Sequence, residues 1–353
     1  MIRMSSALEN SVRPFPLAAE PRHWIASPRF DLVFFILAPL ITAPIVAGVR
    51  FSISYLAALG LVLAIPHYLS TGSFLMWEEN AAYQRSRLAL YAGVPVLIAI
   101  IYSLLVGFRV PAVMPAVLFI WTVFHVARQN CGILGIYRHR SGVTDPRQKR
   151  LANTAIVSVS AWLSLWFIDT HESLIPLHVN PRWTKWAWIA AGSVAIFAIV
   201  HLAIGLVARL RRGESMTFPE AAFLGMSLVM FAPYALIHDV NTATYVMLLP
   251  HYLQYLGIVW LMNRRRAMAT ERRDPLRKLS ASVPLLVLVL AAIGIAGTAV
   301  FMRQRALNDL ALYQSIFTLI AFEHYYFDGL VWAFKQPHVR QTLGPWLARP
   351  EAA

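Results

Sequence analysis

The stretch "LLPHYLQYLGIVW", from Leu248 to Trp260, places a proline and a histidine inside an apolar segment long enough to cross a membrane. The tetrapeptide Pro-His-Tyr-Leu occurs a second time at 66–69, inside another apolar segment. One shared tetrapeptide is weak evidence for an internal duplication in a chain this rich in apolar residues. An ionisable side chain at membrane depth is costly, and it usually faces the interior of a helix bundle or a cavity. The stretch therefore indicates an embedded helix that carries a functional group inward.

The composition favours a membrane protein throughout. Of the 353 residues, 58% are hydrophobic and 14% are charged, and the mean hydropathy is +0.57. A soluble domain has about a quarter of its residues charged. This chain has too few charges to cover a surface in water, so we expect an all-α, polytopic integral membrane helical bundle.

The apolar segments predict the number of membrane-spanning helices. Each is close to the ~20 residues that a spanning helix needs. Ten can be marked, at 30–49, 51–77, 89–108, 110–137, 151–168, 186–209, 219–238, 242–262, 283–302 and 308–334. We expect a single transmembrane domain over 30–335, with an N-terminal tail at 1–29 and a C-terminal tail at 336–353.

The basic residues predict how the chain is oriented. The net charge is +14, and the Lys and Arg residues gather after the second, fourth, sixth, eighth and tenth apolar segments. By the positive-inside rule, these loops and both termini lie in the cytosol. The Arg264–Arg266 run is expected to face anionic lipid headgroups. We therefore expect membrane lipids as partners, no nucleic acid, and a place in the cytoplasmic (inner) membrane of a bacterium.

Four of the eleven histidines lie well inside apolar segments. All four are on even-numbered segments, which run in the same direction toward the cytosol. At a rise of ~1.5 Å per residue, their distances from the following charged helix ends place the imidazoles within about 10 Å of one another in depth. We expect His67, His125, His251 and His324 to converge on one site.

Polar residues stand one helical turn after these histidines, on the same helix face. They are candidates to orient the rings, and they are Thr71, Gln129, Gln254, Tyr255 and Asp328. Asp328 is the strongest candidate, because a carboxylate at i+4 can accept from a ring N–H or hold a cation. Pro66 and Pro250 are expected to kink their helices beside the site.

Facing imidazoles at membrane depth favour a metal. The single cysteine, Cys131, excludes a disulfide within the chain and a cysteine-based metal site. Imidazole suits iron, copper and zinc, and the scarcity of carboxylates in these segments argues against a Glu/His di-iron centre. The leading interpretation of the residues themselves is a shared site for one divalent transition metal.

Other interpretations of the histidines stay open at this point. Zinc or copper can replace iron, a bis-histidine haem can use two of the rings, and each histidine can be satisfied separately by its neighbours. A transporter or channel can use such residues as a proton or metal relay. A transporter for an ionic substrate would usually carry more Asp, Glu or Arg at mid-membrane than this chain does.

Four short patches around these residues resemble the Brp/Blh family of membrane-bound carotenoid dioxygenases. The counterparts are "IPHYL" (His67), "VFHVARQN" (His125), "LPHYLQY" (His251) and "EHYYFDGLVWAFKQPH" (His324, Asp328, His338). The third segment of the family often carries two histidines four residues apart, where this chain has His251 and Tyr255. The resemblance implies oxidative cleavage of a β-carotene-like substrate by iron, which histidines on several spans would hold. With this resemblance, the leading hypothesis is a mononuclear Fe(II) oxygenase that takes O₂ and a lipophilic, unsaturated small molecule from the bilayer.

Overall fold

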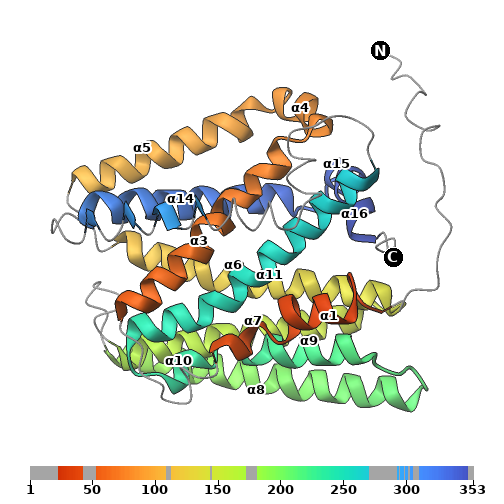
Figure 1. Ribbon diagram of the computed structural model, residues 1–353. Coiled ribbons are helices and arrows are strands. Elements are labelled where there is room, and N and C mark those ends of the chain that lie inside the picture. The colour runs from red at the N-terminus through yellow and green to blue at the C-terminus, as the bar shows by residue number, and fades with distance from the viewer. Residues whose placement is uncertain are drawn as a thin grey trace.

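The computed structural model describes residues 23–42, 53–108, 113–143, 145–171, 181–269 and 310–348, with short pieces between 292 and 304. Every element in these ranges is a helix (Figure 1). Five helices are long and apolar enough to cross a membrane, at Ala89–Gly107, Ala116–Arg140, Pro146–Thr170, Arg182–Arg211 and Val240–Ala269. The chain is therefore all-α with the character of a membrane protein, while the total of ten spans and the cytosolic termini stay predictions.

The long helices follow the predicted apolar segments, to within three residues at 51–77, 89–108, 110–137 and 308–334 and with longer ends at 151–168, 186–209 and 242–262. They are α3 (Ile53–Leu75), η4 (Ala89–Gly93) running into α5 (Val94–Gly107), α6 (Val113–Arg140), α7 (Pro146–Thr170), α8 (Pro181–Arg211), α11 (Val240–Ala269) and α14 (Leu310–Val331). In Figure 1, α3 and α11 run diagonally through the centre, α14 crosses α3, α5 lies above, and α7 and α8 lie below. The remaining short helices are α4 (Glu78–Arg85), α15 (Pro337–Thr342) and α16 (Gly344–Ala348).

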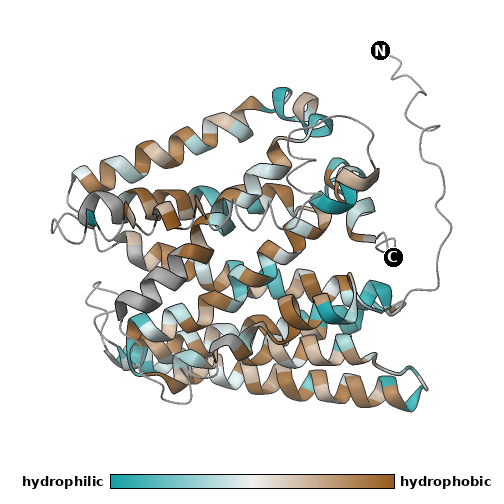
Figure 2. Ribbon diagram, in the orientation of Figure 1, coloured by the Kyte–Doolittle hydropathy of each residue, from teal (hydrophilic) through white to brown (hydrophobic). Residues whose placement is uncertain are grey.

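The outer helices carry apolar side chains on their exposed faces. Leu97 and Leu104 of α5 and Phe197 and Ile204 of α8 are all more than half exposed, and Figure 2 shows hydrophobic residues along much of both helices. A soluble protein rarely exposes such continuous apolar surface. These faces are suited to lipid.

Two predicted spans differ from single α-helices. The segment expected at 30–49 is divided, in its described part, into α1 (Pro28–Asp31), a π-helix η2 (Leu32–Ile36) and a 3₁₀-helix η3 (Ala38–Thr42). The segment expected at 219–238 contains α9 (Phe218–Val229) and α10 (Pro233–Leu236). Pro233 lacks a backbone N–H, which ends regular α-helical bonding there, and the 12 residues of α9 reach only about 18 Å. The predicted span 283–302 lies largely outside the described residues.

Two of the three arginines in the Arg264–Arg266 run are buried and bond within the protein, whereas Arg264 is partly exposed, so contact of the run with lipid headgroups stays a prediction for Arg264 alone. Arg265 is 5% exposed and Arg266 is 7% exposed. Arg265 donates to the carbonyl oxygens of Ile25 and Trp346, and Arg266 pairs with Glu79 at 3.0 Å. This end of α11 thus connects segments from the start, middle and end of the chain.

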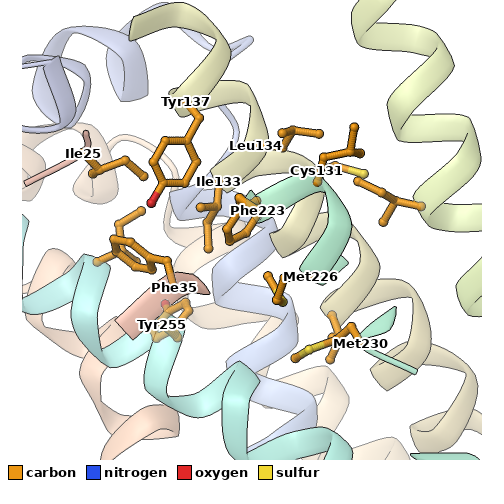
Figure 3. Close-up of a cluster of buried hydrophobic side chains, with 14 of the residues drawn as sticks. Ile25, Phe35, Cys131, Ile133, Leu134, Tyr137, Phe223, Met226, Met230 and Tyr255 are labelled. Carbon is orange, nitrogen blue, oxygen red and sulfur yellow. The ribbon is translucent and has the colours of Figure 1, made fainter. Parts of the chain in front are cut away.

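A hydrophobic core holds α1 and η2 against α6 and α9. Ile25 and Phe35 are fully buried with Tyr137 of α6 and Phe223 of α9, as Figure 3 shows. Asp31 anchors the same region, because its carboxylate accepts from two backbone N–H groups and from the Tyr137 hydroxyl. The N-terminal described segment is therefore packed into the bundle.

Gly257 lets η2 approach α11 closely, which yields a prediction on stability. A Cβ at this position would lie 2.9 Å from the Cβ of Phe34 and 3.0 Å from its ring. We expect Gly257→Ala to destabilise the protein by about 1–3 kcal/mol, because the contact must open. Thermal unfolding in detergent measures this, with Gly132→Ala on α6 as the control, since a Cβ there meets nothing within 4 Å. Equal melting temperatures for both variants would contradict this packing.

Candidate metal centre

The four predicted histidines lie together where α3, α6, α11 and α14 meet. In this crossing, α3 packs against α11 and α14, and α6 packs against α14. The ring centroids of His67 and His324 are 4.4 Å apart, and those of His67 and His251 are 4.7 Å apart. His125 completes the group, at 5.1 Å from His251 and 5.3 Å from His324. Segments far apart in the sequence thus bring four imidazoles into mutual contact.

Three of these histidines have the geometry of a metal site. One ring nitrogen from each of His67, His125 and His324 lies within 4.8 Å of the others. His251 is adjacent through its ring, although its nitrogens do not join the group at that distance. The cluster is therefore a compact triad with a fourth imidazole against it.

The buried nitrogens of the cluster lack protein partners. Both ring nitrogens of His67, Nε2 of His125, Nδ1 of His251 and Nε2 of His324 are buried without a hydrogen-bond partner. A buried polar atom left in this state costs about 1–3 kcal/mol, and native proteins rarely tolerate several together. The donor set fits a bound transition metal, which would satisfy these nitrogens jointly.

A hydrogen-bond chain determines which nitrogen of His324 faces the cluster. The hydroxyl of Thr71 donates to Oδ1 of Asp328 at 2.8 Å, so its one proton is used. The contact between Thr71 Oγ1 and Nδ1 of His324, at 2.9 Å, then requires the ring to donate. Nδ1 carries the proton, and Nε2 is left with a free lone pair toward the other imidazoles. This is the arrangement by which outer hydrogen bonds orient metal-binding histidines.

The predicted orienting residues are all close to the cluster, but Thr71 and Tyr255 bond to partners other than those expected. Thr71, predicted to orient His67, bonds to His324 on another helix. Tyr255, predicted beside His251, donates to Asp328 at 2.5 Å. Residues at i and i+4 share a helix face, yet at a tight helix crossing the nearest polar group belongs to the neighbouring helix.

The two glutamines form hydrogen bonds with backbone carbonyl groups and with each other. Gln129 donates to the backbone carbonyl of His251 at 3.2 Å and to the side chain of Gln254 at 3.3 Å. Gln254 in turn donates to the carbonyl of Phe35. The amide nitrogen of Gln129 and the side chain of Gln254 thus bond to groups other than the imidazoles, and their role in orienting ring nitrogens stays a prediction.

The prolines beside the site do not interrupt their helices. Pro66 lies within α3 and Pro250 within α11, and both helices continue past them. The hydroxyls of Tyr68 and Tyr252, two residues after each proline, are 3.3 Å apart. The repeated Pro-His-Tyr-Leu tetrapeptides thus face one another across the α3–α11 crossing.

Aromatic residues form one wall of the cluster. Tyr325 lies over His125 with ring centroids 4.5 Å apart, and its hydroxyl is 2.8 Å from that of Thr122. Sequence reasoning missed Thr122, although its position three residues before His125 on α6 is a usable signal. Trp121 packs against Tyr325 at 5.9 Å. Together with Val117, Ile120 and Phe124, it also borders a shallow, open apolar groove on the surface of α6.

His338, which the resemblance includes, lies away from the four imidazoles. Its Nε2 is 2.9 Å from Oδ1 of Asn80, and its ring stacks on Tyr83 with centroids 3.9 Å apart. Partial burial, with the nearby Arg87, lowers the pKa of His338. This histidine secures the start of α15 against α4.

No protein family, no curated protein and no solved structure matches this chain. The relationship to the Brp/Blh family therefore stays an expectation from the four short patches.

Proposed function

We propose that this chain is an integral membrane non-haem iron oxygenase acting on a lipophilic, unsaturated substrate. The observation that carries the proposal is the cluster of buried histidines, with unpaired nitrogens, at the crossing of four helices in a membrane-type bundle. Intramembrane ionisable groups gathered at one point are usually functional. His67, His125 and His324 would hold the metal, with His251 as a fourth ligand.

The distances between the histidine ring nitrogens support a site for a single metal ion. With metal–nitrogen bonds of 2.0–2.1 Å, tetrahedral ligands stand about 3.3 Å apart, and the three nitrogens are already within 4.8 Å. Small side-chain rotations close the difference. Two axial haem ligands would instead need a porphyrin between their rings, and centroids 4.4–5.3 Å apart leave no space for one.

The residues around the cluster would orient the metal ligands and exclude water in an oxygenase. Iron, when bound, supplies the capacity to activate O₂. The Thr71 hydroxyl holds Nδ1–H of His324 and so presents Nε2 inward, and Gln129 holds the backbone at His251. The aromatic wall of Tyr68, Tyr252 and Tyr325 keeps water from the imidazoles, since all three side chains are buried.

The apolar groove on α6 supports a lipophilic substrate. Its members Trp121 and Phe124 come directly before His125 in the sequence, within one helical turn. Among the four histidines, His125 has the most exposed side chain, at 9%. An isoprenoid or polyene chain lying in the groove would reach the cluster at this residue.

Oxygen consumption by the purified, iron-loaded protein in lipid nanodiscs tests this function. We expect uptake that depends on added polyene, with β-carotene, a shorter isoprenoid and a polyunsaturated phospholipid as the panel. The control is His201→Ala, an exposed position on α8, which should behave as wild type. Co-expression in a carotenoid-producing host tests one substrate. Unchanged pigment would remove carotenoids, whereas an iron-loaded protein that consumes no oxygen with the whole panel would reject the oxygenase.

A further inference from the structure

Asp328 places a carboxylate at the histidine cluster. It lies on α14 one turn after His324 and is 5% exposed. A carboxylate buried at membrane depth needs a compensating partner. The contacts of the two carboxylate oxygens of Asp328 indicate what that partner is.

The two oxygens of Asp328 have different surroundings. Oδ1 accepts from the hydroxyls of Thr71, at 2.8 Å, and Tyr255, at 2.5 Å. These bonds fix the orientation of the carboxyl plane. Oδ2 lies 3.7 Å from Nε2 of His125 and 3.7 Å from Nε2 of His324. Oδ2 and two imidazole nitrogens that lack hydrogen-bond partners therefore border one common space.

The distances fit an ion between these groups better than a direct hydrogen bond. A charge-assisted N–H···O bond measures about 2.7–2.9 Å, well short of 3.7 Å. Two ligands of one metal, each about 2.0–2.2 Å from it, stand on the order of 3–4 Å apart. The two distances from Oδ2 to the imidazole nitrogens, 3.7 Å each, lie within that range.

The charge of a divalent ion also favours a carboxylate among its ligands. A divalent ion held by neutral imidazoles alone would leave two positive charges in a low-dielectric site, which is costly. One carboxylate ligand halves the net charge. Carboxylate and imidazole ligands also occur together in non-haem Fe(II) sites.

We propose that Asp328 is a direct metal ligand through Oδ2, and that Thr71 and Tyr255 are positioning residues that hold Oδ1. The inference rests on the proposed metal site and extends its ligand set from imidazoles to a carboxylate.

Titration of the full-length, metal-free protein in detergent with Co²⁺ tests the assignment, because Co²⁺ absorption reports both affinity and ligand geometry. We expect Asp328→Asn to weaken binding more than 100-fold and to change the Co²⁺ spectrum. Tyr255→Phe leaves the ligand in place and should weaken binding by about 10–100-fold, as outer-shell changes do, with the wild-type spectrum. Asp328→Asn with wild-type affinity and spectrum would overturn the proposal.

Infrared difference spectra of the wild-type protein, labelled with ¹³C-aspartate, make the test independent of variant folding. Adding metal should shift an aspartate carboxylate band, and Asp328→Glu should retain a carboxylate shift if it folds. A wild-type protein that binds metal with no carboxylate shift would reject Asp328 as a ligand and leave the histidine site standing. A wild-type protein that binds neither Co²⁺, Fe²⁺ nor Zn²⁺ would reject the proposed metalloenzyme itself.

Discussion

His67→Ala and His324→Ala are each expected to lose high-affinity metal binding, with the affinity for Fe²⁺ or Co²⁺ falling by at least about 1,000-fold. Each change removes one of three nitrogens that lie within 4.8 Å of one another. His324→Ala also removes the ring Nδ1–H that donates to Oγ1 of Thr71. Oxygenase activity should fall with the metal.

Competition with a chromophoric chelator measures these affinities, and the matched control is His201→Ala on α8. His201 is exposed, and its Nδ1 is 2.9 Å from the carbonyl of Phe197. That variant should bind metal as wild type does. If any two of the four cluster variants retained full binding, the four-histidine ligand set would be wrong.

Glu220→Gln is expected to destabilise the fold by about 3–5 kcal/mol, the usual cost of leaving buried charges without their partner. Glu220 is fully buried, and its carboxylate pairs with Arg138 at 3.2 Å and with Arg209 at 2.7 Å. Both arginines are themselves buried, at 3% and 2% exposed. Removing the carboxylate charge leaves two guanidinium groups together at the junction of α6, α8 and α9.

The chain supplies a matched control for this prediction. Glu214 also pairs with an arginine, Arg212, at 2.7 Å, but both side chains are about half exposed. Exposed pairs contribute little to stability, so Glu214→Gln should unfold like the wild type. Thermal unfolding in one detergent compares the two variants. A Glu220→Gln protein as stable as Glu214→Gln would show that the buried network is not what secures this junction.

The long helices could be predicted from the sequence because a membrane requires about 20 apolar residues for each span. α3 and α14 begin and end within three residues of the predicted limits. The gathering of the histidines was also predictable, since all four stand on segments of one direction at a similar depth. Helix direction and the 1.5 Å rise suffice for that inference.

The partners inside the site could not be predicted in the same way. Which hydroxyl bonds to His324 depends on how α3 and α14 cross. Thr71 is 253 residues away from His324 in the sequence, so no local pattern predicts this contact. The burial of Arg265 has the same origin, because its acceptors come from both ends of the described chain. Local periodicity predicts the helices, and tertiary packing decides these contacts.

The metal content of the purified wild-type protein tests the central claim most directly. Elemental analysis of protein from iron-supplemented cells, purified without chelators, should give close to one transition-metal ion per chain, with iron as the main element. The same preparation of a His67→Ala/His324→Ala double variant should contain almost none. A folded wild-type protein without metal, which also takes up none when iron is added under reducing conditions, would contradict a metal centre at these histidines.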